Sequence, residues 1–413
     1  MKSLEQLNLF SAVEEAYLNN SGQLTQSQLY EHVSNELGVN PNDYYGVVGK
    51  NSVKCNLFYR KVRWVQQSLK CGQLLENVSK GVWRLVGKAK EKLEVIEEGK
   101  SVIAMSTALG IVINSETQSV LSKDIIPEKS VHLVVTSPPF LLQNARDYGG
   151  PTVQQDWLDF MMSVFEPIRS RMVEGGSLFI NIGQDSFIPR KPARTTHLER
   201  FIIAMEDAGY YLVDRIILRS NKAPSPYAWT SLHRYMLKSS YDFCFHFTTD
   251  PKQLFTNNQE ILLPHTEEHT RFVLNGGVPS DYKGSSDGAY SKRTGDYGKS
   301  GLSKGRLPDN SPYFANRCTH NELVNKYARE NGLATHGAKM PYKIAKWLIQ
   351  YGSRVGNLVF DPFYGSGTTC EAAEELGRRW IGCEYIKQFI QQSFVRYRTL
   401  TDEIWVNPAF ALD

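Results

Sequence analysis

The sequence lacks the features of a membrane-bound or disulfide-stabilised protein. Its 413 residues contain no uninterrupted apolar run of the roughly 18 residues that a membrane helix needs. The first residues also lack the charged and apolar segments of a signal peptide. Six scattered cysteines form no Cys-x-x-Cys pair, which favours reduced thiols over a disulfide framework or a zinc site. We therefore expect a cytoplasmic protein that binds no metal.

Internal repeats and long low-complexity segments are absent too. This absence argues against a fibrous or solenoid architecture. The composition is 41% hydrophobic and 22% charged, which is typical of a folded globular chain. At roughly 150 residues per domain, the length predicts two or three domains.

Positive charge is concentrated in one short segment, although the net charge is only +4. Residues 1–49 hold one basic and six acidic side chains, whereas residues 50–92 hold eleven basic and two acidic ones. A local basic block of this kind is typical of a nucleic-acid-binding surface.

The first 92 residues predict a small helical unit with a hairpin. Apolar spacing predicts one helix over 24–33, with a threonine cap before it and Gly38 after it, and a second over 57–70. Two short strands are expected within 72–85. This outline resembles the winged-helix modules at the amino end of some restriction-system proteins. We expect DNA contacts from Arg60, Arg63, Lys80 and Arg84.

A structural reading of the same segment remains open. In this alternative the basic side chains form a solvated surface that does not bind DNA, and Trp64 and Trp83 are core residues. Independently of this choice, residues 93–107 are predicted to be a linker, because residues 91–100 are rich in charge.

From residue 131 the pattern changes to alternating strands and helices. Buried strands are predicted over 131–135, 177–182 and 212–218, and again over 357–360 and 379–384, with helices between them. This alternation predicts an α/β domain with a mainly parallel sheet.

Residues 252–335 interrupt the alternation. Eight glycines lie between Gly276 and Arg306, and from Lys283 to Arg306 six basic residues stand against two acidic ones. We expect this insertion to contact a polyanion, although a plain surface loop would have the same composition. The candidate DNA contacts are Lys283, Lys292, Arg293, Lys304 and Arg306.

One candidate binding loop lies between the predicted strand 357–360 and the following helix. Its glycines allow a tight turn and a close approach of a ligand to the backbone. An acidic residue, Glu384, ends the next strand, where nucleotide-binding sheets hold ribose hydroxyls. The loop lacks the lysine of a phosphate-binding P-loop, so S-adenosylmethionine fits better than ATP. The predicted cofactor contacts are Asp361, Pro362, Phe363, Gly365, Ser366, Gly367, Thr368 and Glu384.

A second loop, Ser137-Pro138-Pro139-Phe140, follows the strand 131–135. Two prolines fix the backbone, so that the Ser137 hydroxyl and the Pro138 carbonyl can accept hydrogen bonds from an exocyclic amino group. The Phe140 ring offers a surface on which an extruded base can stack. A proline-rich turn alone would be weak evidence for a catalytic role. The presence of the glycine loop in the same chain makes this evidence stronger.

Together these motifs resemble the β-group DNA amino-methyltransferases, which methylate amino groups of cytosine or adenine with S-adenosylmethionine. The resemblance covers roughly residues 108–400 and includes the circularly permuted motif order. It implies a Rossmann-like fold with a catalytic half at 108–251, a target-recognition region at 252–335 and a cofactor-binding half at 336–413. By the same resemblance Thr136 and His336 are expected at the cofactor site.

Serine at the first position of the tetrapeptide is similar to cytosine-N4 enzymes, whereas adenine-N6 enzymes usually carry Asp or Asn. We therefore expect a methyltransferase that flips cytosine out of duplex DNA and methylates N4, with adenine N6 as the nearest alternative. A cognate restriction endonuclease is a possible partner. A catalytically inactive DNA-binding regulator and an RNA amino-methyltransferase are two further hypotheses that the sequence leaves open.

Overall fold

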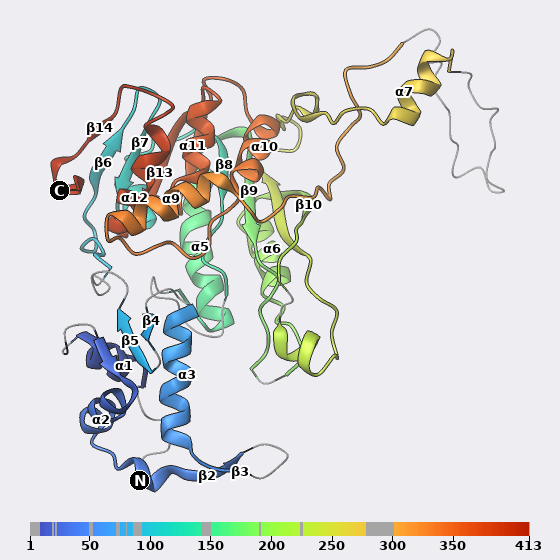
Figure 1. Cartoon of the computed structure of the whole chain (residues 1–413). Coiled ribbons are helices and arrows are strands. Elements are labelled where there is room, and N and C mark those ends of the chain that lie inside the picture. Colours follow the sequence, from blue (N-terminus) through green and yellow to red (C-terminus); the bar gives the residue numbers. More distant parts are fainter. Residues whose placement is uncertain are drawn as a thin grey trace. The chain divides into compact units, whose positions relative to one another are not determined.

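The computed structural model describes residues 9–18, 20, 23–48, 53–71, 75–79, 81–85, 93–141, 150–189, 191–223, 226–277 and 301–412 (Figure 1). The chain divides into two compact units. The first lies within residues 1–92 and includes 329–334, and the second comprises 93–328 and 335–413. Within the described residues, no helix has both the length and the apolar character needed to cross a membrane.

The described residues of the first unit form three α-helices and a three-stranded antiparallel sheet with the order β1-β5-β4. The predicted helices and hairpin are confirmed. A second hairpin, β2-β3, was not predicted. The elements are α1 Leu9–Leu18, β1 Gln23–Thr25, α2 Gln26–Leu37, η1 Pro41–Tyr44, β2 Tyr45–Val48, β3 Val53–Asn56, α3 Leu57–Cys71, β4 Leu75–Ser79 and β5 Val82–Leu85.

Local chemistry defines both ends of α2. The Thr25 hydroxyl accepts a hydrogen bond from the Gln28 amide at 3.3 Å, and the Gln28 side chain accepts one from the Thr25 amide at 2.9 Å. This reciprocal pair is a capping box, which satisfies amides that the first helical turn leaves without partners. Gly38 ends the helix in the left-handed conformation, with a φ of 62°.

The second unit is built on a nine-stranded sheet with the order β10-β11-β9-β8-β12-β13-β7-β6-β14. The central strands β9, β8, β12, β13 and β7 are parallel to one another. The sheet strands are β6 Val102–Ser106, β7 Gly110–Asn114, β8 Val131–Thr136, β9 Met172–Ile182, β10 Tyr211–Arg219, β11 Tyr241–Thr248, β12 Leu358–Asp361, β13 Arg379–Glu384 and β14 Trp405–Val406.

Helices cover both faces of this sheet. On one face α4, α5 and α6 pack through Val120, Trp157 and Phe201. On the other face α10, α11 and α12 pack through Leu348, Ala372 and Tyr397. The helices and helical turns are α4 Thr117–Ser122, α5 Gln154–Arg171, α6 His197–Asp207, η2 Ala228–Leu232, η3 Asn258–Ile261, α7 Glu267–Leu274, α9 Thr319–Glu330, α10 Tyr342–Gly352, α11 Thr368–Glu375, α12 Lys387–Tyr397 and η4 Pro408–Phe410.

The centre of the sheet is a topological switch point. From β8 the chain continues to β9 on one side, whereas from β12 it continues to β13 on the other side. Such a reversal of strand order leaves a crevice at the carboxyl ends of the strands, where ligands bind in open α/β sheets. Both predicted functional loops begin there, after β8 and after β12.

Two expectations from the sequence need correction. The predicted linker 93–107 contains β6, which pairs with β7 and β14 inside the sheet. One of the two partner strands of β6 lies about 300 residues away, so local sequence could not indicate this pairing. The charged residues before β6 also favoured the prediction of a linker. Strand β11 was not anticipated. It runs antiparallel between β9 and β10, and the sheet is therefore mixed at its edge.

We predict that Thr25→Ala lowers the local stability of α2 by about 1 kcal/mol, because it removes half of the capping box. Hydrogen exchange of the α2 amides in the full chain measures this change. Ser27→Ala, at an exposed position in the first turn, is the control and should leave the exchange rates nearly unchanged. Equal effects of both substitutions would contradict the role of the capping box.

Candidate active site

The two functional loops meet at the junction of β8 and β12. The Thr136 hydroxyl donates a 2.6 Å hydrogen bond to Asp361 Oδ1, and the Thr369 hydroxyl donates to the Val135 carbonyl at 3.2 Å. Thr136, Asp361 and Thr369 are all buried. These bonds fix the end of β8 against the glycine loop that follows β12.

A cavity of about 520 Å³ opens at this junction. This volume lies within the range of small-molecule sites, roughly 300–1,000 Å³. A smaller cavity of about 40 Å³ shares several lining residues with it, including Ser137, His336 and Gly365. Ser137 therefore lines both cavities.

The tetrapeptide 137–140 is held rigidly from both sides. Ser137 Oγ donates to the Asn181 carbonyl at 3.4 Å, and the Trp157 indole N–H donates to the Pro139 carbonyl at 2.8 Å. The Phe140 ring packs against Gly183, where a Cβ atom would lie only 2.7 Å from the ring. Only glycine at position 183 leaves the Phe140 ring in this place.

The glycine loop turns around the carboxylate of Glu384. Gly365, with a φ of +53°, donates its amide to Glu384 Oε2 at 2.8 Å, and Ile386 donates its amide to Oε1 at 2.9 Å. Glu384 is buried but lines the larger cavity. Burial raises the pKa of its carboxyl group to about 8, against the opposing effect of these two amides.

Asp361 lines the smaller cavity. Burial raises the pKa of its carboxyl group to about 6, although the Thr136 hydroxyl and the Phe363 amide both donate to it. Two carboxyl groups with raised pKa values therefore lie at the carboxyl ends of adjacent strands, β12 and β13. Perturbed carboxyl groups in a cavity are typical of a functional site.

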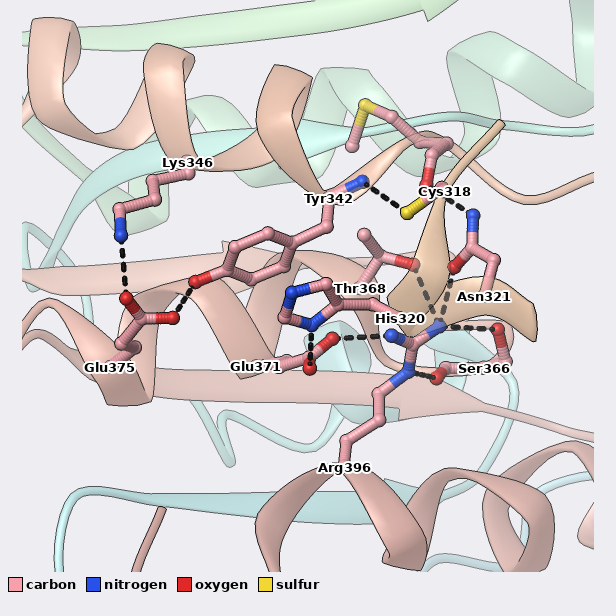
Figure 2. A network of polar contacts seen from close by, with 11 residues as sticks. Cys318, His320, Asn321, Tyr342, Lys346, Ser366, Thr368, Glu371, Glu375 and Arg396 are labelled. Carbon is pink, nitrogen blue, oxygen red and sulfur yellow. Dashed lines mark hydrogen bonds and ion pairs between the residues drawn. The ribbon is translucent and has the colours of Figure 1, made fainter. Parts of the chain in front are cut away.

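A buried arginine supports the glycine loop through several hydrogen bonds, as Figure 2 shows. Arg396 of α12 is 2% exposed. Its Nε donates to the Ser366 carbonyl at 2.5 Å, and its Nη2 donates to Thr368 Oγ1 at 3.2 Å and to Asn321 Oδ1 at 2.8 Å. Glu371 pairs with the same guanidinium, which offsets the cost of burying its charge.

The same network reaches α9 and α10 (Figure 2). His320 Nδ1 lies 2.7 Å from Glu371 Oε1, and its ring stacks on Tyr342 at 3.9 Å between centroids. The Tyr342 hydroxyl donates to Glu375, which also accepts from Lys346 at 2.5 Å. The glycine loop is thus connected to helices from three different parts of the chain.

The structure brings most of the predicted catalytic and cofactor residues to the cavities. The larger cavity is lined by Ser137, Pro138, Pro139, Phe140, His336, Pro362, Phe363, Gly365 and Glu384, and the smaller one adds Asp361, Ser366 and Thr368. Two predicted contacts line neither cavity. Thr136 instead holds Asp361, and Gly367 caps α11 with a φ of 80°.

The lining residues of the two cavities include none of the described residues that were predicted to contact DNA. Arg60, Arg63 and Arg84 are exposed residues of the first unit. Arg306 pairs with Leu263 in an isolated antiparallel bridge, and Lys304 lies two residues before it; both side chains are exposed. The predicted contacts Lys80, Lys283, Lys292 and Arg293 lie outside the described residues.

The cavity also has lining residues that the sequence patterns did not single out. They come from the segments after β7 and β13 and from α5 and α12: Ser115, Glu116, Thr117, Phe160, Tyr385, Ile386 and Phe389. A prediction of strand β7 would have indicated the residues that follow it, because ligand contacts in parallel sheets cluster at the carboxyl ends of the strands. This strand itself was not predicted.

The cavity suits a nucleoside-containing cofactor. The Glu384 carboxylate can accept hydrogen bonds from a ribose diol, and Ile386, Phe363 and Phe389 offer apolar surface for a purine ring. A side chain at Gly365 would approach His336 to 3.3 Å and fill part of the space.

Comparisons with known proteins agree with this geometry. A family model described as DNA methylase matches residues 131–395. Type II methyltransferase M.PvuII of Proteus hauseri is 27% identical over 282 residues, which cover 66% of this chain and 79% of that protein. M.BglII of Bacillus subtilis is 23% identical over 297 residues, covering 71% and 70%.

A solved structure described as PvuII DNA methyltransferase (cytosine-N4-specific) superposes with a TM-score of 0.55 at 22% identity. The match covers 71% of this chain and 87% of that one, and it establishes a common fold. The family model spans both functional loops and the sheet between them. The chain therefore belongs to the DNA methylase family.

Proposed function

We propose that this protein transfers a methyl group from S-adenosylmethionine to the N4 amino group of cytosine in duplex DNA. The observation that carries the proposal is that Ser137 and the rest of the tetrapeptide line the same cavity as the carboxylate Glu384. Ser137 also lines the smaller, adjoining cavity. An amino group held by Ser137 would then face the methyl donor.

The residues around the larger cavity would hold the cofactor. Glu384 would accept hydrogen bonds from the ribose, and Phe389 and Ile386 would contact the adenine. When bound, the cofactor supplies an electrophilic methyl group on a sulfonium, which is a good leaving group. The protein therefore needs mainly to position the acceptor nitrogen in line with that methyl group.

The tetrapeptide would prepare the amino group for attack. The nitrogen of an exocyclic amine is a poor nucleophile because its lone pair is conjugated with the ring. Hydrogen bonds from its two hydrogens to the Ser137 hydroxyl and the Pro138 carbonyl favour a more tetrahedral nitrogen. A new N–C bond would form as the S–C bond of the sulfonium breaks, one amino proton would pass to solvent, and S-adenosylhomocysteine would be the leaving group.

The choice of cytosine rests on Ser137 and on the relatives. The solved relative with the same fold is described as cytosine-N4-specific. A serine hydroxyl both accepts and donates hydrogen bonds, so it suits an amino group next to a ring nitrogen. Adenine N6 presents the same pair of groups and remains the second candidate.

The target base must leave the helix to reach this site, because Ser137 and Phe140 lie beside a cavity and are only partly exposed. Base flipping costs a few kcal/mol of unstacking. We propose that contacts to the DNA backbone offset this cost. The relatives are Type II methyltransferases, so we also propose a cytoplasmic setting with a restriction endonuclease that recognises the same site.

The first unit would contribute to DNA binding as a winged-helix module. The described helices α1, α2 and α3, together with the three-stranded sheet of order β1-β5-β4, support this proposal. Trp83 is buried, in agreement with the structural reading, but Trp64 of α3 is 59% exposed and is not a core residue. Arg60 and Arg63 are exposed on the same helix.

The direct test is mass spectrometry of nucleosides from duplex DNA incubated with the protein and isotopically labelled S-adenosylmethionine. We expect labelled N4-methylcytosine. Labelled N6-methyladenine would overturn the assignment of the base. The absence of label from DNA, with label in RNA or with cofactor binding alone, would favour an RNA methyltransferase or an inactive regulator.

We predict that Ser137→Ala slows single-turnover methyl transfer by about 10- to 100-fold, or roughly 1.4–2.7 kcal/mol, because the amino group loses one acceptor. Cofactor affinity, measured by calorimetry, should stay nearly unchanged. Ser137→Thr keeps the hydroxyl and should recover part of the rate. A parallel loss of cofactor affinity in Ser137→Ala would indicate a structural role instead.

We predict that cofactor affinity rises with pH up to about 8 and then levels off. The pKa of Glu384 in the free protein is raised to about 8, and only the ionised carboxylate accepts hydrogen bonds from both ribose hydroxyls. Below pH 8 binding must therefore release a proton, which weakens affinity by up to about tenfold per pH unit. Asp361, with a pKa of about 6, extends the effect to lower pH.

Glu384→Gln is the matched variant for this pH dependence. It binds the cofactor more weakly, and its affinity should not change between pH 7 and 9. Titration calorimetry in buffers of different ionisation enthalpy also counts the released protons. A wild-type affinity that is constant from pH 6.5 to 9 would contradict the role of Glu384.

We predict that Arg60→Ala with Arg63→Ala weakens duplex binding and lowers the slope of log affinity against log salt by about 1.8, at roughly 0.9 per phosphate contact. Lys252→Ala, an exposed charge of the second unit, is the control. Unchanged affinity and slope in the double variant would leave α3 without a role in DNA binding.

A further inference from the structure

The connection between β10 and β11 has an unusual composition that the proposed function does not use. From Arg219 to Ser240 it contains no aspartate or glutamate, but it holds Arg219, Lys222, Arg234 and Lys238. Four of its large apolar side chains are exposed: Tyr227 by 69%, Leu232 by 65%, Tyr235 by 71% and Leu237 by 90%. Exposed apolar side chains concentrated in one short segment are typical of an interaction surface.

The described part of this connection is ordered by its own contacts. The Tyr235 amide donates to the Trp229 carbonyl at 2.8 Å, and the His233 amide donates to the Ala228 carbonyl at 2.8 Å. The Tyr235 ring stacks on the Trp229 and His233 rings at centroid distances of 6.2 and 5.6 Å. Arg234 adopts a left-handed φ of 59° in the same turn. The turn thus presents Tyr235 and Leu237 on a preformed scaffold.

Ion pairs anchor the base of the connection to the segment that follows β9. Lys222 Nζ lies 3.3 Å from Asp185 and 2.7 Å from Asp242. Ser239 donates to Asp185 and accepts from Arg194 at 2.9 Å. Lys222 is therefore neutralised locally, whereas Arg234 and Lys238 are exposed on the turn itself.

The connection lies at the catalytic edge of the sheet. Strands β8, β9 and β10 point in the same direction, because β11 is antiparallel to both β9 and β10. The carboxyl end of β10 therefore lies on the same edge as Ser137. The anchoring segment after β9 begins at Gly183, which packs against Phe140. In Figure 1 the loop with η2 extends from this edge beyond β10.

We propose that residues 226–238 form a DNA-contacting element, with exposed apolar side chains against the base stack and Arg234 and Lys238 on the phosphates. This proposal rests on the proposed function, because the occupant is the duplex that presents the target base. Extrusion of a base leaves a gap in the stack, and apolar side chains stabilise such unstacked steps in other complexes. The absence of acidic residues complements the polyanion and favours DNA over a second copy of this basic surface.

The test uses the full-length enzyme with duplex oligonucleotides of known methylation site. Leu237→Ala is the first variant, since a side chain that is 90% exposed contributes little to folding. We expect a loss of duplex affinity of about tenfold, with unchanged cofactor affinity and salt slope. The loss should shrink when the target base is mismatched, because a mismatched base is already weakly stacked.

Arg234→Ala with Lys238→Ala tests the charged part. We expect the salt slope to fall by about 1.8. Val355→Ala and Lys252→Ala are matched controls, with exposed side chains at the opposite edge of the sheet. Duplex affinity equal to wild type in both test variants overturns the proposal, as does an equal loss in the controls.

Two further outcomes separate a DNA contact from a contact between copies of the chain. If Leu237→Ala changes the oligomeric state in sedimentation and leaves DNA affinity intact, the surface joins copies of this chain and the proposal is wrong. If the wild-type enzyme binds the cofactor but no duplex DNA, the proposed function fails, and the DNA-contacting role fails with it. A loss of duplex affinity in the test variants, without a loss in the controls, supports both the proposed function and the DNA-contacting role.

Discussion

The hydrogen bond between Thr136 and Asp361 joins two strand ends that are 225 residues apart in sequence. Strands β8 and β12 are neighbours at the centre of the sheet, so the loop after each of them starts at the same crevice. This adjacency brings Ser137 and the glycine loop to a common cavity. The site therefore depends on this one pairing and on the buried threonine that fixes its end.

The rigidity of the glycine loop comes from buried charge rather than from the loop itself. Glycines permit the turn at Gly365 and Gly367, but they do not hold it. Arg396 binds the carbonyl of Ser366 and the hydroxyl of Thr368, and Glu371 compensates its charge. Removing either partner would leave an uncompensated charge in the core. Glu384 and Asp361 are buried on either side of this loop, and their burial raises the pKa values of both carboxyl groups.

Local patterns predicted much of this architecture, and long-range contacts account for the rest. The apolar run 131–135 and the motif at Asp361 indicated both loops, because proline and glycine restrict the backbone in recognisable ways. Strand β6 was missed, since its partners lie in β7 and near the carboxyl terminus. The contact of Thr136 with the cofactor stays a prediction, and the structure adds that its hydroxyl donates to Asp361. No local pattern indicates such a choice of partner, nor the role of Arg396.

A crystal structure with bound S-adenosylhomocysteine would test the account most directly. The account predicts the ribose hydroxyls within hydrogen-bond distance of Glu384, about 2.6–3.2 Å, and the sulfur directed toward Ser137 at the junction of the two cavities. The adenine should lie against Phe389 and Ile386. Binding of the ligand elsewhere, or with its sulfur directed away from Ser137, would contradict the claim that the β8 and β12 loops together form the active site.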